Sequence, residues 1–473
     1  MPRPARPGLA RPSAREPDRV TVEQDWRSLG SGSTPVVTPT SATTPVVTPS
    51  SAITLPVAVG SATAPVVTPG SDPVSGADDA VRGPAYDAVL LLGFGGPEGQ
   101  DDVIPFLRNV TRGRGIPEDR LETVATHYRA FGGVSPVNGQ NRALRAALEA
   151  ELADRGEPLP VYWGNRNWTP LLADTVRAAS AAGHTRLLAI TTSAYSSYSS
   201  CRQYREDIAG ALTTNGLDAT MRIDAVRPYF DEPGFTVPFV EGARAALARL
   251  AARGLPVART HVLFTTHSIP TADAARSGPR GVDFGAGGAY LAQHRAVAAA
   301  VMAALAEQAT AARPAAGPAT AAERAQPEWS LAFQSRSGPP AMPWLEPDVN
   351  DALRALAADG TQAVVIVPIG FISDHMEVLW DLDTEAAATA TTLGLTMERV
   401  ATPGIHPAFV AALATLALER LHGPAAHFPE VSQIDVHEAR EPRYATPHGI
   451  SWGDVCPSGC CEKGAGRPVR PAS

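Results

Sequence analysis

The sequence has few features that would tie the chain to a membrane or to nucleic acid. No apolar run reaches the roughly 20 residues that a bilayer-spanning helix needs, and no apolar signal-peptide core lies near the N-terminus. No basic stretch is interleaved with aromatic residues, and the formal net charge is −8. We therefore expect a cytoplasmic protein without a nucleic-acid partner and without stable membrane insertion.

Lysine and cysteine are both scarce. Lys463 is the only lysine among the 40 cationic residues, a bias that we attribute to a GC-rich genome rather than to function. Of the four cysteines, Cys456, Cys460 and Cys461 stand together near the C-terminus, and Cys201 lies far upstream. Because cytosolic proteins seldom use structural disulfides, such a cluster indicates metal binding or redox chemistry.

Large apolar residues are rare in residues 1–84, which are rich in Pro, Ser, Thr, Gly and Ala. Such a segment buries too little surface to offset the entropy lost on ordering, so we expect it to be disordered. The motif Thr-Pro-Val-Val-Thr-Pro at 34–39 recurs at 44–49, and with Ala first at 64–69, which is a low-complexity tract. The Arg-rich opening resembles a transit peptide, but we favour a flexible tail or a misassigned start codon.

From Tyr86 onward, short apolar runs alternate with helical patterns, which predicts an α/β fold with doubly wound parallel sheets. This part of the chain is too long for a single sheet of this kind. A break near 227–234 is a candidate domain junction, and 424–473 reads as an irregular tail. The predicted strands are 88–94, 160–165, 186–193, 219–226, 261–267, 329–335 and 363–371. The predicted helices are 118–131, 137–155, 170–183, 199–213, 235–253, 286–308 and 407–422.

Chemically informative segments follow three of the predicted strands, where α/β proteins bind ligands. The first is the glycine-rich turn 93–97, which lacks the spacing of a dinucleotide fingerprint. The second carries His267 at a strand end. A lone histidine is more often structural than catalytic, but strand-end loops are where function concentrates.

The third segment, 368–385, carries Glu377, Asp381 and Glu385 at intervals of four residues, which places them on one face of a helix. A solvated acidic face is the ordinary interpretation of such spacing. Together with His267, the alternative is a base beside a carboxylate track for a hard or borderline cation.

Four motifs occur in the same order as in a known family. They are Leu91-Leu-Gly-Phe-Gly-Gly-Pro97, Tyr128-x-x-Phe-Gly-Gly-Val-Ser-Pro136, Phe264-Thr-Thr-His-Ser-Ile-Pro270 and Gly370-Phe-Ile-Ser-Asp-His-Met-Glu377. Over residues 86–423 the sequence resembles the ferrochelatases. The resemblance implies two similar Rossmann-like domains with a cleft between them. The first would comprise 85–227 plus the returning segment 405–423, and the second 228–404.

The resemblance also implies the site residues. His267 would be the base and Glu377 its partner, both contacting the substrate Fe²⁺, with Asp381 and Glu385 on the path of the iron. The porphyrin cleft would include Phe94, Gly95, Ser135, Pro136 and Tyr195. Some branches of the family have Tyr or Met in place of Phe94, and because Phe cannot ligate a metal, iron delivery through that side chain is excluded.

A subset of the family carries a [2Fe–2S] cluster, which takes four thiolates, and the chain has four cysteines. The spacing Cys456-x-x-x-Cys460-Cys461 departs from the pattern of animal relatives, and tetrahedral zinc is the alternative. The resemblance implies a monomer that inserts Fe²⁺ into coproporphyrin III and contacts the next haem-pathway enzyme transiently. The alternatives are a chelatase for protoporphyrin IX or sirohydrochlorin, and a noncatalytic haem-binding or iron–sulfur sensor protein.

Overall fold

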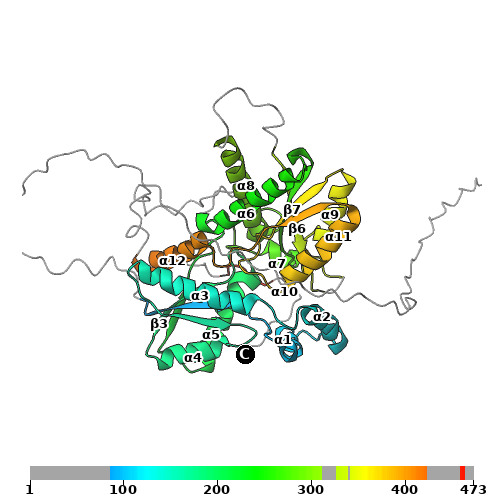
Figure 1. Cartoon of the computed structure of the whole chain (residues 1–473). Coiled ribbons are helices and arrows are strands. Elements are labelled where there is room, and N and C mark those ends of the chain that lie inside the picture. The colour runs from blue at the N-terminus through cyan, green and yellow to red at the C-terminus, as the bar shows by residue number, and fades with distance from the viewer. Residues whose placement is uncertain (1–85, 312–325, 339–340, 423–458, 464–473) are drawn as a thin grey trace, which may run out of the picture. The chain divides into compact units, whose positions relative to one another are not determined.

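The computed structural model describes residues 86–311, 326–338, 341–422 and 459–463 (Figure 1). The predicted tail 1–84 and Cys456 lie outside these residues. The first of two sheets is parallel and four-stranded, with the order β2-β1-β3-β4. Its strands are β1 (Ala88–Gly93), β2 (Val161–Asn165), β3 (Arg186–Thr191) and β4 (Arg222–Ala225).

The second sheet is also parallel and four-stranded, with the order β6-β5-β7-β8. Its strands are β5 (Thr260–His267), β6 (Glu328–Gln334), β7 (Ala363–Val367) and β8 (Thr396–Arg399). The α/β class with parallel sheets is confirmed. Strand β8 was not predicted, because its four residues are mostly polar and only partly buried at the sheet edge.

Helices cover the sheets on both faces (Figure 1). The α-helices are α1 (Val103–Val110), α2 (Glu118–Ala130), α3 (Val137–Asp154), α4 (Leu172–Ala181), α5 (Gln203–Thr214), α6 (Pro233–Ala252), α7 (Thr271–Ala275), α8 (Gly288–Ala311), α9 (Val349–Ala358), α10 (Met376–Val378), α11 (Ala387–Leu393) and α12 (Pro407–His422). Two short 3-10 turns, η1 (Gln100–Asp102) and η3 (Val257–Arg259), and two π-helical segments, η2 (Tyr198–Arg202) and η4 (Leu379–Ala386), complete the described elements.

Strand β1 shows why its apolar run is continuous. Val89 and Leu91 enter the core shared with α3 and α12, whereas the alternate residues Leu90 and Leu92 pack with α4 and α5. Successive strand side chains point to opposite faces, so a strand covered on both sides has to be apolar throughout.

One apolar core is shared by both sheets. It contains Val89 of β1 and Phe264 of β5, and it takes side chains from α3, α6, α8 and α12. Helix α12 packs against α3 and α6, so the last helix contacts layers that belong to different sheets. The opposite face of the second sheet forms a separate core with α9 and η4.

Helix α8 corrects one expectation from the sequence. Residues Gly288–Glu307 are long and apolar enough, by length and composition alone, to cross a membrane. However, 67% of that window is buried inside the protein, and its side chains belong to the shared core. The run was overlooked because Gln293, His294 and Arg295 interrupt it.

Candidate functional site

The predicted histidine and its carboxylate partner meet at the carboxyl ends of β5 and β7. His267 is the last residue of β5, and Glu377 lies in α10, which follows the turn after β7. The Gly370 N–H donates to the Thr265 carbonyl at 3.1 Å, which folds that turn back onto β5. As a result, His267 Nε2 lies 3.5 Å from Glu377 Oε2.

The hydrogen bonding of His267 fixes the role of each ring nitrogen. Nδ1 bonds the carbonyl of Ser268, and because a carbonyl only accepts, Nδ1 carries a proton. In the neutral ring Nε2 then presents its lone pair toward the Glu377 carboxylate. Two acceptors face each other favourably only with a proton or a cation between them, so the pair is suited to proton transfer or to metal binding.

A second histidine adjoins this pair and was not singled out from the sequence. His375 Nδ1 accepts the Glu377 N–H at 3.2 Å, which caps α10, and lies 3.9 Å from Glu377 Oε2. Burial lowers the pKa of His375, and the nearby negative charge of Glu377 only partly opposes this. The signal was present in the Asp374-His375 pair of the quoted motif.

The acidic row lies on a π-helical segment rather than on the regular α-helix that was expected, because Asp381 and Glu385 belong to η4. Burial raises the pKa of Asp381 to about 7, against a hydrogen bond from Ser335, and the charges of Glu377 and Glu385 raise it further. Glu385 accepts from Trp380 Nε1 at 2.8 Å. Asp381 is therefore not a fully solvated surface acid.

An aromatic group from α1 and α2 adjoins the acidic row. Phe106 makes edge contacts with Phe94, Tyr128 and Trp168, at centroid distances of 6.4, 5.8 and 6.0 Å. Burial raises the pKa of Tyr128, and the charges of Glu377 and Asp381 add to the shift, which places its hydroxyl near both carboxylates.

Helix α2 also contacts η4 directly. The ring of His127 stacks on that of Trp380 at 4.0 Å with an interplanar angle of 7°. The segment with the aromatic side chains and the segment with the carboxylates are therefore held side by side.

The residues predicted to line a porphyrin cleft have different surroundings. Phe94 is 42% exposed, and Gly95 has φ +85°, with Asn165 Cβ only 2.9 Å from where its Cβ would lie. Ser135 is buried against Gly96, and Pro136 stands at the N-cap of α3.

Tyr195 lies in the shared core. Its side chain is 2% exposed and stacks on His294 inside the shared core, and its hydroxyl donates to the Ile369 carbonyl at 2.8 Å. Tyr195 is therefore a buried core residue, and its place in a porphyrin cleft stays a prediction. Its neighbours come from α8 and from the turn after β7, and the sequence around Tyr195 does not predict these distant contacts.

Three of the four cysteines are described, and the fold brings them together. Cys461 Sγ lies 3.5 Å from Cys201 Sγ and 3.7 Å from Cys460 Sγ, distances too long for a disulfide bond. The Gly278 N–H donates to Cys461 Sγ at 3.2 Å. Ser197 is the N-cap of η2, the helical segment that contains Cys201.

The sulfur separations of 3.5 and 3.7 Å are contact distances between neighbouring sulfur atoms. Two thiolates bound at about 2.3 Å to one tetrahedral metal lie roughly 3.8 Å apart. Among the described residues no group of three or more His, Cys, Asp or Glu is arranged to hold a metal ion. The separations between neighbouring sulfur atoms are thus compatible with a shared metal, but the three cysteines do not form a complete ligand set. Cys456 is not among the described residues.

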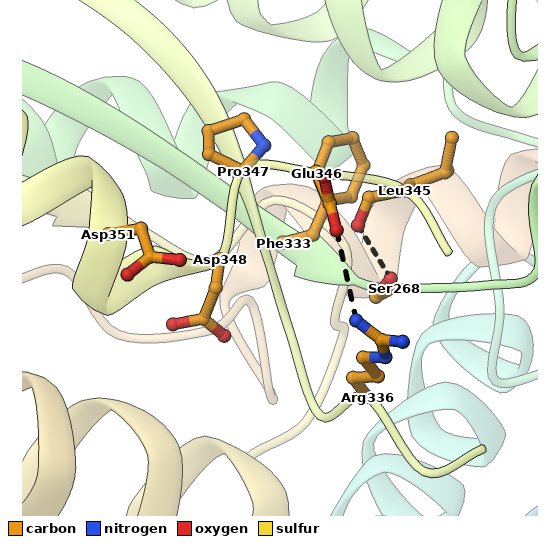
Figure 2. A pocket seen from close by; sticks show the side chains of 8 residues that line it. All are labelled: Ser268, Phe333, Arg336, Leu345, Glu346, Pro347, Asp348 and Asp351. Carbon is orange, nitrogen blue, oxygen red and sulfur yellow. Dashed lines mark hydrogen bonds and ion pairs between the residues drawn. The ribbon is translucent and has the colours of Figure 1, made fainter. Parts of the chain in front are cut away.

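A cavity of about 380 Å³ is lined by Ser268, by Phe333 of β6, by Arg336, and by residues of the segment that leads into α9 (Figure 2). Its charged side chains serve local purposes. Arg336 pairs with Glu346 at 3.8 Å, and Asp348 caps α9 by accepting the Asn350 N–H. None of the predicted site residues lines it.

Known proteins resemble this chain over most of its length. The ferrochelatase family model matches residues 86–421. The chain belongs to the ferrochelatase family. Proteins named coproporphyrin III ferrochelatase from Leifsonia xyli, Tropheryma whipplei and Streptomyces griseus are 53%, 47% and 50% identical to it. The alignments cover 82%, 83% and 82% of this chain and 93%, 93% and 97% of those relatives.

The ferrochelatase family comprises enzymes that insert iron into porphyrins, so the resemblance inferred from the four motifs is confirmed. The solved structure of SirB from Bacillus subtilis with Fe³⁺ covers 72% of this chain and 98% of its own at 14% identity. Its TM-score is 0.39, a likeness too distant to support a conclusion.

Proposed function

We propose that this protein inserts Fe²⁺ into coproporphyrin III in haem biosynthesis, giving coprohaem. The observation that carries the proposal is its identity of 47–53% to three coproporphyrin III ferrochelatases over nearly their whole length. The facing pair His267 and Glu377 supports it, because metal insertion needs a base. We place the enzyme in the cytoplasm as a monomer that contacts the next haem-pathway enzyme transiently.

The chemistry requires two pyrrole N–H protons to leave as the iron enters. His267 Nε2 presents a lone pair toward the site and takes the first proton, since Nδ1 is occupied by the Ser268 carbonyl. Glu377, at 3.5 Å, stabilises the imidazolium or accepts the proton onward. The base and the incoming metal need access to pyrrole nitrogens that a planar ring hides, so binding has to hold the macrocycle bent.

The acidic row supplies the iron path in this proposal. Carboxylate oxygens suit a hard or borderline divalent cation, and Asp381 stands between Glu377 and Glu385 in charge interaction with both. The carboxylates of Glu377, Asp381 and Glu385 repel one another when charged, and a cation entering along η4 would reduce this repulsion. The porphyrin contacts Phe94, Gly95, Ser135 and Pro136 in a cleft between the proposed domains, 85–227 plus 405–423 and 228–404.

The substrate assignment is tested by anaerobic turnover of coproporphyrin III, protoporphyrin IX and sirohydrochlorin with Fe²⁺, followed by loss of porphyrin fluorescence. We expect kcat/KM to be highest for coproporphyrin III. A preference for protoporphyrin IX or sirohydrochlorin would reassign the substrate. Tight haem binding without turnover of any tetrapyrrole would identify a noncatalytic protein.

We further propose that Cys201, Cys456, Cys460 and Cys461 hold a [2Fe–2S] cluster. The sulfur separations of 3.5 and 3.7 Å support shared metal ligation, and the Gly278 N–H favours a thiolate at Cys461. When bound, the cluster would supply metal–thiolate links between η2 and the C-terminal segment. It would be structural or sensory, because inserting Fe²⁺ needs no electron transfer.

Anaerobically purified protein tests this cluster. We expect a reddish-brown colour with about two irons and two sulfides per chain, as a [2Fe–2S] centre requires. Cys201→Ser should lose the colour. Colourless protein with one tightly bound zinc would establish the tetrahedral alternative, and metal-free protein with four titratable thiols would reject both.

A further inference from the structure

A buried polar cluster lies directly behind His267 and has no part in the chemistry proposed above. Thr266 and His294 are fully buried, and Tyr290 is 5% exposed. Thr266 is the neighbour of His267 on β5, whereas the other two lie on α8. Burying polar groups is costly unless each is hydrogen-bonded, so the partners of these three side chains are informative.

Backbone carbonyls at both ends of the cluster fix which groups donate. His294 Nδ1 lies 2.7 Å from the Tyr290 carbonyl, which only accepts, so Nδ1 carries the proton. Burial lowers the pKa of His294 to about 3, so the ring is neutral and Nε2 accepts from Thr266 Oγ1 at 2.8 Å. The single proton of Thr266 is thereby used. The His267 carbonyl also only accepts, so the Tyr290 hydroxyl donates its single proton there at 2.8 Å, and the 2.9 Å contact between the Tyr290 and Thr266 oxygens has no proton of its own.

The hydrogen bond from the Tyr290 hydroxyl holds the peptide that follows His267, and the orientation of the His267 ring depends on that peptide. The His267 carbonyl belongs to the peptide that leads to Ser268, and the Ser268 carbonyl bonds His267 Nδ1. A rotation of the first peptide would displace the second carbonyl, and with it the direction in which Nε2 points toward Glu377. We propose that Tyr290 is a positioning residue, whose hydroxyl fixes the His267 peptide and thereby aims the imidazole at Glu377.

Tyr290 is itself fixed from two sides. Its backbone N–H donates to Ser277 Oγ at 2.8 Å, and Ser277 Oγ donates to the Ala274 carbonyl, which anchors the start of α8 to the segment after α7. On the other side, His294 stacks on Tyr195 with ring centroids 3.6 Å apart. The hydroxyl of Tyr290 is therefore presented by a rigid helix and not by a loop.

The same cluster supports the segment that carries Glu377. The Tyr195 hydroxyl donates to the Ile369 carbonyl, and Gly370 lies so close to Thr266 that an added Cβ would stand 2.6 Å from Thr266 Cβ. The cluster thus contacts the strand ending in His267 and the turn leading to Glu377, and it sets both against α8.

The test is Tyr290→Phe, which removes one hydroxyl and keeps the ring. This inference rests on the proposed role of His267. We expect kcat for coproporphyrin III to fall roughly 10- to 100-fold, as a small misplacement of a catalytic group costs, with KM for the porphyrin and for Fe²⁺ unchanged. A purely structural role would lower the melting temperature without this separation of kcat from KM.

The matched control is Tyr229→Phe. Tyr229 is 1% exposed, and its hydroxyl donates at 2.8 Å to the carbonyl of Thr191, the last residue of β3. It makes the same kind of bond in the other sheet, so we expect a similar loss of stability and an unchanged kcat. If kcat fell equally in both variants, or in neither, the positioning role would be rejected.

A second variant covers the case in which Tyr290→Phe is too unstable to assay. Ser277→Ala keeps the Tyr290 hydroxyl but removes its anchor, and it should lower kcat by a smaller factor at constant KM. An unchanged kcat in Ser277→Ala would then overturn the inference. His267→Ala separates this outcome from failure of the proposed function, because wild-type turnover in His267→Ala rejects the role of His267 itself.

Discussion

At the scale of single residues, the proton on His267 Nδ1 has a direct consequence for mutation. Only Nε2 is available as a base, so His267→Ala should abolish turnover, with a loss of at least about 10²-fold, the usual contribution of a general base. Porphyrin binding, measured by fluorescence quenching, should persist because the surrounding aromatic residues remain.

The control for this variant is another histidine–carboxylate pair. His184 Nδ1 lies 3.7 Å from Asp87 at the amino ends of the first sheet, away from the strand ends that carry His267. His184→Ala should keep full turnover. Near-normal activity in His267→Ala would contradict its assignment as the base.

Asp381 predicts a pH dependence of iron use. Its pKa is raised to about 7, so the side chain gains its negative charge as the pH passes through neutrality. We expect the apparent KM for Fe²⁺ to fall across this range, because the charged carboxylate attracts the cation. The measurement is turnover at a series of Fe²⁺ concentrations between pH 6 and 8, and Asp381→Asn should remove the dependence.

The same pKa shift makes a prediction about stability. The folded pKa lies above the ordinary value of 3.8, so the folded state binds more protons between about pH 4 and 7, and stability falls as the pH rises through that window. Asp381→Asn should therefore melt at a higher temperature than the wild type at pH 8, with the difference shrinking toward pH 4. A lower melting temperature for the variant at pH 8 would contradict this reasoning.

Residues were predictable from the sequence where a strand end carried them. His267 and Glu377 follow apolar strands that pair in the sheet, so their approach could be anticipated. The burial of Tyr195 was not anticipated and Tyr290 was overlooked, because their partners lie on elements distant in the chain. A side chain's environment in the shared core is set by packing, which no local pattern reports.

At the scale of elements, the turn after β7 depends on the absence of a side chain at Gly370. A Cβ there would lie 2.6 Å from Thr266 Cβ and 2.7 Å from Thr266 Cα, so strand β5 would have to shift. Gly370→Ala should cost about 1–3 kcal/mol, as overpacking does, and should lower kcat by moving His267 and Glu377 apart. Thermal melting and steady-state kinetics measure the two effects.

Gly139→Ala is the matched substitution. Gly139 lies within α3, and an added Cβ would meet nothing within 4 Å. Alanine is the better helix former, so this variant should melt at the same or a higher temperature. Equal destabilisation by both substitutions would show that contact with Thr266 is not the cause.

Elements were predictable in proportion to their apolar periodicity. The seven predicted strands are all present, and the central strands β1, β5 and β7 are apolar runs covered on both faces. Strand β8 was missed because an edge strand needs little apolar surface, and η4 was expected as an α-helix because the acidic spacing suits both forms. The residue types in a helix give little indication of whether its backbone hydrogen bonds follow the α-helical or the π-helical pattern.

At the scale of the whole molecule, residues 459–463 of the C-terminal segment contact parts of the chain that flank different sheets. Arg202, the last residue of η2, donates to the Cys460 carbonyl at 3.3 Å, and the Cys461 N–H donates to the Gly278 carbonyl at 3.1 Å. A chain ending at residue 458 should therefore melt at a lower temperature, with a larger loss if the proposed cluster links Cys460 and Cys461 to Cys201.

A chain ending at residue 463 is the control, because it keeps Cys460, Cys461 and their contacts. It should melt as the full chain does. Equal melting temperatures for all three chains would show that residues 459–463 do not hold the fold together.

The apolar core shared by both sheets has a calorimetric consequence. Unfolding of either sheet would expose apolar surface that is buried against the other sheet and against helices α6, α8 and α12. We therefore do not expect the two halves to unfold separately. We expect one endotherm whose calorimetric and van't Hoff enthalpies agree. The two α/β halves that the topology distinguishes would then form a single cooperative unit, and the geometry of His267 and Glu377 would persist until the whole protein melts.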